Sequence, residues 1–148
     1  MQIRPYEACD LAELARLFND YRVFYAQPAD LELASRFIEA RVRGGDSAIL
    51  VAPGGEGSLA GFCQLYPSFC SVAAAPIYVL YDLYVAPEHR RNGIAKRLLE
   101  SAAARAKCDG KVRMDLTTAK DNFNAQALYE SLGWQRDDVF YTYNLLIN

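Results

Sequence analysis

The stretch VAPEHRRNGIAKRLLESA, residues 85–102, gathers five side chains that can carry positive charge around a single glycine. An apolar run precedes it and helical spacing follows it, which predicts a strand, a tight turn and a helix. Such a turn leaves backbone N–H groups unpaired at the positive end of the helix dipole. Gly93 lets that backbone approach an anion without a Cβ in the way. The residues alone leave two interpretations open, an anion cradle or a solvated basic helix end.

Composition and charge narrow the classes of function. A length of 148 residues is typical of one domain, which we expect over residues 1–148. The formal net charge of -2 argues against a broad nucleic-acid footprint. Neither the P-loop pattern nor GxGxxG occurs, which disfavours nucleotide hydrolysis and dinucleotide binding. Four scattered cysteines, one His and no long apolar run predict a cytoplasmic protein with reduced thiols, no zinc site and no membrane span.

Hydrophobic periodicity predicts a mixed arrangement of strands and helices. We expect strands at residues 2–6, 48–52, 59–66, 77–85, 111–118 and 139–147, and helices at 10–21, 30–44, 94–108 and 122–133. Asp10 and Asp30 stand where they can cap the first two helices. This order fits a mixed α/β (α+β) sheet covered by helices and does not fit a strict βαβ repeat.

Two motifs carry a resemblance to a known family. Residues 85–95, VAPEHRRNGIA, match at every defined position the acyl-CoA signature of the GNAT superfamily of N-acetyltransferases, Val-x-Pro-x-x-(Gln or Arg)-x-x-Gly-x-(Gly or Ala). Residues 122–134, NFNAQALYESLGW, are similar to the later motif of that family. The resemblance implies a mostly antiparallel mixed sheet of six to seven strands with a splayed strand pair, covered by about four helices.

The resemblance also implies a cofactor, acetyl-CoA, with CoA as the product. Its pyrophosphate would lie on the backbone N–H groups of residues 90–96, and its pantetheine arm would pair with the free edge of the strand that ends at Val85. The cofactor-binding residues expected on this basis are Leu83, Tyr84, Val85, Arg90, Arg91, Asn92, Gly93, Ile94, Ala95, Lys96, Asn122 and Tyr129.

The chemistry of acetyl transfer requires a neutral amine, although a lysine-like amine has a pKa near 10.4. Asp82 lies between apolar and aromatic residues beside the expected cofactor strand, and the polyamine acetyltransferases that resemble this stretch carry an acid there. Asp82 can therefore act as a base through water or only bind the ammonium. Tyr81 stands where those enzymes often have a second acid. The family resemblance implies that Tyr129 protonates the departing thiolate.

The stretch between the first two helices, YRVFYAQP, is unusually aromatic and lies where the family places its acceptor-binding loop. It contributes four of the expected substrate-binding residues beside Asp82, namely Tyr21, Phe24, Tyr25 and Gln27. Aromatic faces can hold a cation as well as an apolar stem. We expect a small-molecule primary amine as the acceptor, with a protein or histone lysine, or a non-catalytic CoA-binding regulatory module, as alternatives. The final strand is suited to a homodimer.

Overall fold

The computed structural model describes residues 2–148. The chain falls into two compact units, Met1–Leu116 and Thr117–Asn148, and each is described by itself. The single domain expected over residues 1–148 stays a prediction. Within the described residues, none of the helices is both long and apolar enough to cross a membrane.

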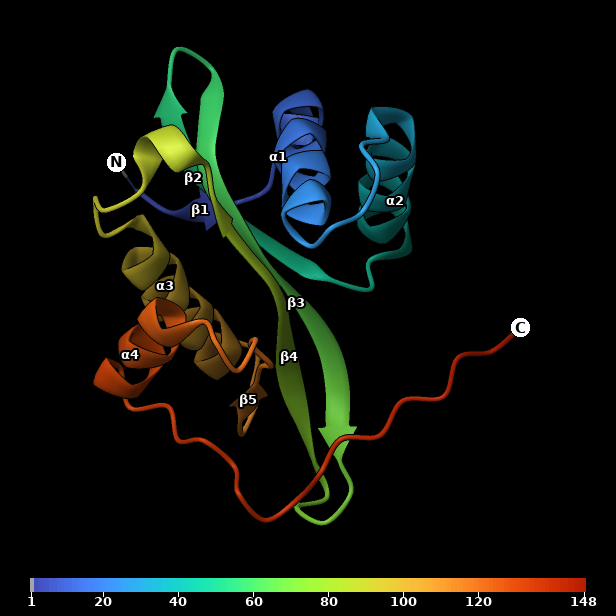
Figure 1. Ribbon diagram of the computed structural model, residues 1–148, viewed down its shortest axis with the longest axis vertical. Helices are drawn as coiled ribbons and strands as arrows, with labels where there is room; N and C mark the ends of the chain where they lie inside the picture. The colour runs from blue at the N-terminus through green and yellow to red at the C-terminus, as the bar shows by residue number, and fades with distance from the viewer. Residues whose placement is uncertain (1) are drawn as a thin grey trace. The chain divides into compact units, whose positions relative to one another are not determined.

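The first unit is built on a five-stranded sheet in the order β1-β2-β3-β4-β5. Its strands are β1 (Arg4–Pro5), β2 (Ala48–Gly55), β3 (Ser58–Cys70), β4 (Ala75–Val85) and β5 (Met114–Asp115). Neighbouring strands are antiparallel except β4 and β5, which are parallel. The long β3–β4 hairpin forms the spine of this sheet (Figure 1). The mixed, mostly antiparallel class is confirmed, although residues 2–148 form five strands and not the six to seven expected.

Three α-helices cover the sheet of the first unit. They are α1 (Leu11–Phe24), which follows the 3-10 turn η1 (Ala8–Asp10), α2 (Leu31–Gly44) and α3 (Ile94–Cys108). The helices α1 and α2 pack against each other on one face of the sheet, and α3 packs on the other (Figure 1). The second unit contains α4 (Phe123–Ser131), so the described residues hold four α-helices, as expected.

One of the two expected caps is confirmed, and the other is wrong. Asp30 caps α2, because its carboxylate accepts a hydrogen bond from the Leu33 backbone N–H at 3.0 Å. Asp10 makes no such bond to α1. Its carboxylate instead accepts two hydrogen bonds from the Arg4 guanidinium, at 2.8 and 2.9 Å, and one from the Glu7 N–H at 2.8 Å. The Arg4 contact, opposed by burial, lowers the pKa of Asp10 and fixes the chain before α1.

The two faces of the sheet bury different side chains. An aromatic core lies under α1 and α2, where Phe18 stacks on Phe37 at 5.3 Å and meets Phe62 of β3 edge-on. On the other face, α3 buries the stripe that its sequence predicted, Ile94, Leu98, Leu99 and Ala102. Because the side chains of a strand alternate, Phe62 and every second residue along β3 share the aromatic face.

The prediction of a final strand at 139–147 is wrong. Residues 135–148 form no strand, and their apolar side chains are exposed. Alternation of apolar residues makes a strand only where a partner strand supplies the ladder of hydrogen bonds, and the described residues of the second unit contain none. The strand expected at 111–118 is also shorter, because β5 pairs with β4 only at Tyr78 and Val79.

Candidate active site

A β-bulge in β4 shapes the site. Gln64 of β3 pairs with Asp82, but the next residue of β3, Leu65, pairs with Leu80. Tyr81 is therefore an extra residue without an opposite partner, which locally bends and twists the strand. The Tyr21 hydroxyl of α1 donates a hydrogen bond to the carbonyl of this extra residue at 3.3 Å. The bulge is thus tied to the last turns of α1.

The bulge decides which backbone groups of β4 face away from β3. The Tyr78 N–H donates to Arg113 on the β5 side at 3.1 Å, whereas the Ala86 N–H donates to Ala60 of β3 at 2.8 Å. By alternation from Ala86, the backbones of Leu83 and Val85 face away from β3, along an edge that β5 does not reach. This edge can accept an extended ligand. Tyr84 instead turns its backbone toward β3.

Asp82 is a buried carboxyl, with 4% of its surface exposed. Its Oδ2 accepts a hydrogen bond from Gln64 Nε2 at 2.6 Å, and its carboxyl also interacts with the Tyr21 hydroxyl. Burial raises the pKa of Asp82 because the charged form loses hydration, and the Gln64 hydrogen bond and the nearby Tyr21 hydroxyl oppose that rise. No cationic side chain of the described chain is among the groups that act on this pKa.

Sequence reasoning did not single out Gln64. Its only signal is an amide side chain in the apolar run LAGFCQLY, and the residue is completely buried. The contact with Asp82 follows from the hairpin register, which places the two residues opposite each other although 18 positions separate them in sequence.

Four aromatic rings form a cluster that reaches Asp82 through Tyr21. Tyr21 lies 5.1 Å from Tyr25 and 6.1 Å from Tyr84, and Phe24 lies 5.2 Å from Tyr25 and 6.5 Å from Tyr84, measured between ring centroids. The sequence placed three of these rings in a connector, but α1 continues to Phe24. Gln27 is exposed, and the structure gives its side chain no part in this cluster.

Arg90 joins the aromatic cluster to the edge of β4. Its Nε donates a hydrogen bond to the Val85 carbonyl at 2.9 Å. Its guanidinium carbon lies 5.8 Å from the centre of the Phe24 ring and 5.5 Å from that of Tyr84. Arg90 therefore stacks on one ring expected to bind the acceptor, Phe24, and on one expected to bind the cofactor, Tyr84, contacts that the sequence did not predict.

The turn before α3 has the geometry of an anion cradle. Arg91 and Gly93 both have left-handed backbones, with φ of 63° and 73°. The first hydrogen bond within α3 runs from Arg97 N to Gly93 O at 3.1 Å, so the N–H groups of residues 94–96 have no partner within the helix. Alternating left-handed residues at a helix N-terminus expose consecutive N–H groups to an anion. An ideal Cβ on Gly93 would meet open space, so the turn leaves room for a phosphate.

The remaining side chains of the cradle are tied locally. Asn92 donates its Nδ2 to the His89 carbonyl at 3.3 Å, and the Lys96 ammonium lies 4.0 Å from the Glu100 carboxylate. Ile94 is buried in the core beneath α3. The backbone, more than these side chains, is therefore available to an anion.

Two expected site residues lie in the second unit. Asn122 caps α4, where its Oδ1 accepts a hydrogen bond from the Ala125 N–H at 3.4 Å. Tyr129 lies on α4 with its ring 6.1 Å from the ring of Trp134, and its carbonyl accepts the Trp134 N–H at 3.0 Å. Within this unit, α4 therefore presents the two residues that the family motif singles out.

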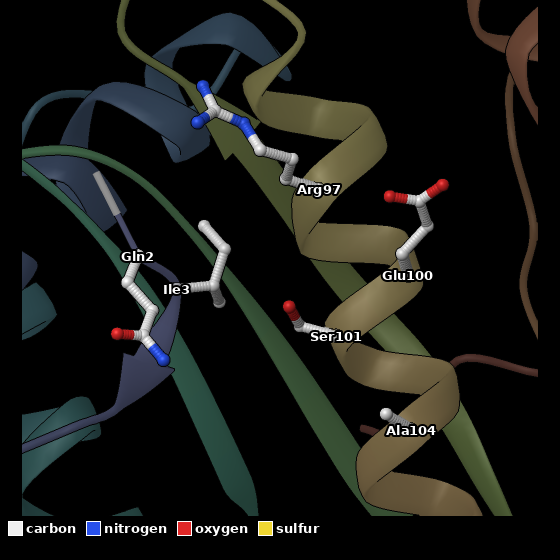
Figure 2. Close-up of a pocket in the computed structure, with 6 residues that line it drawn as sticks. All are labelled: Gln2, Ile3, Arg97, Glu100, Ser101 and Ala104. Carbon is white, nitrogen blue, oxygen red and sulfur yellow. The ribbon is translucent and has the colours of Figure 1, made fainter.

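A separate open hollow lies against the middle of α3. Figure 2 shows Gln2 and Ile3 of the N-terminal segment facing four side chains spaced by helical turns along α3, namely Arg97, Glu100, Ser101 and Ala104. None of the residues expected to bind cofactor or substrate lines it. The candidate site is thus the bulged edge of β4 and the turn before α3, not this hollow.

Comparison with known proteins gives the family. Residues 11–134 match the Acetyltransferase (GNAT) family. The "Uncharacterized N-acetyltransferase YhfO" of Bacillus subtilis (strain 168) is 42% identical over 145 residues, which cover 98% of this chain and 97% of that protein. A solved structure described as a probable acetyltransferase is 41% identical with a TM-score of 0.92, covering 100% of this chain and 99% of the other.

A shorter match reaches a relative whose name states a substrate. The "Aminoglycoside N(6')-acetyltransferase type 1" of Acinetobacter genomosp. 13 is 33% identical over 64 residues, which are 43% of this chain and 44% of that protein. The family match, the full-length relative and the solved structure together show that this chain belongs to the GNAT acetyltransferase family.

Proposed function

We propose that this protein transfers the acetyl group of acetyl-CoA to the primary amine of a small molecule, by direct attack within a ternary complex. The observation that carries the proposal is Asp82, a buried carboxyl beside Tyr21 that forms no ion pair with a cationic side chain among residues 2–148. A buried carboxylate without a cation is costly, and a substrate ammonium would supply the missing charge.

The residues at the anion end fit acetyl-CoA. The N–H groups of residues 94–96 would hold the pyrophosphate, with Arg91 assisting, and the free edge at Leu83 and Val85 would pair with the pantetheine amides. Asn122 is assigned to the cofactor from the family motif alone. When bound, acetyl-CoA supplies a thioester, which is an activated acyl group.

Two residues would handle protons. Asp82 would hold the ammonium and take its proton, directly or through water, because only the neutral amine has a lone pair for attack. Its raised pKa makes it a better proton acceptor than an ordinary aspartate. Tyr129, assigned from the family motif, would donate a hydrogen bond to the departing thiolate.

A small amine is favoured over a basic protein tail. The net charge of -2 provides weak steering toward a strongly basic partner, and one relative is named for an aminoglycoside. Tyr81, at the position where polyamine enzymes often carry a second acid, leaves one carboxylate for one ammonium.

Four free cysteines agree with a cytoplasmic protein, and the exposed apolar residues of 139–147 agree with a homodimer. A CoA-binding regulator is the second candidate, since the cradle would serve either.

A panel of primary amines tests the reaction itself. We expect the purified chain to release CoA thiol from acetyl-CoA with at least one small amine, and mass spectrometry to detect a product heavier by one acetyl group. A panel containing aminoglycosides, amino acids, diamines and a basic histone-tail peptide separates the acceptor classes. Tight CoA binding by calorimetry without turnover on any amine would instead support the regulator.

Gly93→Val tests the backbone cradle. At φ of 73° a β-branched residue is strained, and relief of that strain would distort the turn that presents the N–H groups, so the Kd for CoA should rise about 10-fold or more. Arg91→Ala should weaken CoA binding less, because the backbone is the main contact. Gly45→Val is the matched control, since Gly45 has φ of 60° and equal open space at the end of α2. Equal loss of CoA binding in both valine variants, measured by calorimetry, would contradict the cradle.

Tyr129→Phe tests the proton donor. Removing only the hydroxyl should lower kcat about 10²-fold while the Kd for CoA stays unchanged, because a general acid acts as the thiolate departs. Stopped-assay kinetics and calorimetry on the same preparation give both numbers. A parallel loss of CoA affinity would remove the role assigned to Tyr129 and leave it a binding residue.

Asp82→Asn separates activity from stability. Because burial raises the pKa of Asp82, its contribution to stability is complete below about pH 3.8 and is lost as pH rises through the folded-state pKa. The variant should therefore lose activity yet unfold at a higher temperature than the parent at pH 8. Each pKa unit corresponds to about 1.4 kcal/mol, or about 3–6 °C in Tm for a chain of this size. A lower Tm for the variant at pH 8, with no convergence near pH 4, would show that the carboxylate is structurally required.

A further inference from the structure

The buried amide of Gln64 has one satisfied end and one unsatisfied end. Its Nε2 donates to Asp82 Oδ2 at 2.6 Å, and the residue is 0% exposed. Its Oε1 is buried without a hydrogen-bond partner among residues 2–148. An unpaired buried carbonyl oxygen carries a cost, so a residue that only filled space would be better apolar.

An amide is suited to face a carboxyl that gains and loses a proton. An ionised carboxylate only accepts hydrogen bonds, whereas the protonated acid donates one. Gln64 carries a donor and an acceptor on one group, and half a turn about its last side-chain bond exchanges them. It can therefore hydrogen-bond to Asp82 in both states, which an aliphatic side chain cannot do.

The Tyr21 hydroxyl can also donate and accept, but its proton is engaged with the Tyr81 carbonyl at 3.3 Å, which leaves the exchange at Asp82 to Gln64. The titratable groups that share the surroundings of Asp82 come from α1 and the residue after it, from β3 and from β4 itself, and they are Tyr21, Tyr25, Cys63, Tyr66 and Tyr81. Burial raises the pKa of the Cys63 thiol to about 12 and also raises the pKa of Tyr21, so both stay protonated near neutral pH. Beyond Tyr66, Arg41 and Asp46 lie 3.2 Å apart as an ion pair of their own.

We propose that Gln64 is a positioning residue that stabilises Asp82 in both protonation states during turnover, by donating Nε2–H to the carboxylate and accepting the carboxyl proton on Oε1. The inference rests on the proposed function of Asp82 as the proton acceptor. The amine N–H bond breaks, an O–H bond forms on Asp82, and the nitrogen lone pair is released for attack. The Gln64 amide then rotates by half a turn about its last side-chain bond. The new O–H of Asp82 therefore donates to Oε1 and does not face the N–H donor of Nε2.

Gln64→Met tests the proposal with a side chain of similar length and no amide. The hydrogen bond to the charged carboxylate is stronger than the one to the neutral acid, so losing both should raise the titration of Asp82 by about one pH unit. The acid limb of kcat/KM should move by the same amount, with an unchanged Kd for CoA. Leu65→Met is the matched control, since Leu65 is the next residue of β3, is equally buried and points to the opposite face. It should leave both titrations in place.

A direct readout separates this inference from the proposed function. The carboxyl of Asp82 can be titrated by NMR in the full chain labelled with ¹³C at aspartate, with Asp82→Asn assigning the signal. This titration needs no acceptor amine, so a failure of the amine panel would overturn the reaction without deciding the role of Gln64. If Gln64→Met leaves the Asp82 titration unchanged and only lowers Tm as Leu65→Met does, Gln64 is a packing residue and the inference fails.

Gln64→Glu keeps the test decisive if the methionine variant does not fold. This variant differs from the parent by one amide group exchanged for a carboxyl. Two facing carboxyls share one proton, so the pair should titrate in two separated steps, the upper one above the Asp82 titration of the parent. A single unshifted Asp82 titration in this variant would overturn the contact on which the inference depends.

Discussion

The extra residue in β4 is the constraint on which the rest of the site depends. Because Tyr81 has no partner in β3, the alternation of β4 changes phase there, so that Leu83 and Val85 turn their backbones to an edge that no strand of residues 2–148 covers. The same offset leaves Asp82 opposite Gln64 on the face covered by α1. Without the bulge, either the carboxyl or the free edge would face the wrong way. One irregular residue thus orients both the acid and the strand edge.

The proposed site has an anion-binding end, at the turn before α3, and an amine-binding end, at Asp82. The electrostatics of these two ends follow from different parts of the chain. The anion end is made by backbone N–H groups, which carry only partial charge and remain available because the helix geometry leaves them unpaired. The end proposed to bind the ammonium is made by one carboxyl, Asp82, placed where its charged form loses hydration. The first arrangement costs the fold little, whereas the second disfavours folding at neutral pH. Only the second therefore needs a supporting hydrogen bond of the kind that Gln64 gives.

Local patterns predicted what local interactions decide. Asp30 and Gly93 follow from short-range rules for caps and positive φ, and the structure confirms both ends of α2 and the start of α3. The final strand at 139–147 was predicted wrongly, since its alternation says nothing about whether a partner strand is present. Gln64 was missed for the same reason. Its contact depends on a register across 18 residues and on a bulge that no residue type marks.

Arg90 determines which rings of the aromatic cluster remain available to a bound amine. Its guanidinium already stacks on Phe24 and Tyr84 while its Nε is held by the Val85 carbonyl. Those two rings therefore have a cation of their own, and a second cation placed beside the same faces would be repelled. In the proposed reaction, the rings left to an incoming ammonium are those of Tyr21 and Tyr25, and Tyr21 is the one that lies beside Asp82. Recognition of the amine would then depend chiefly on Asp82, and the rings would contribute shape more than charge.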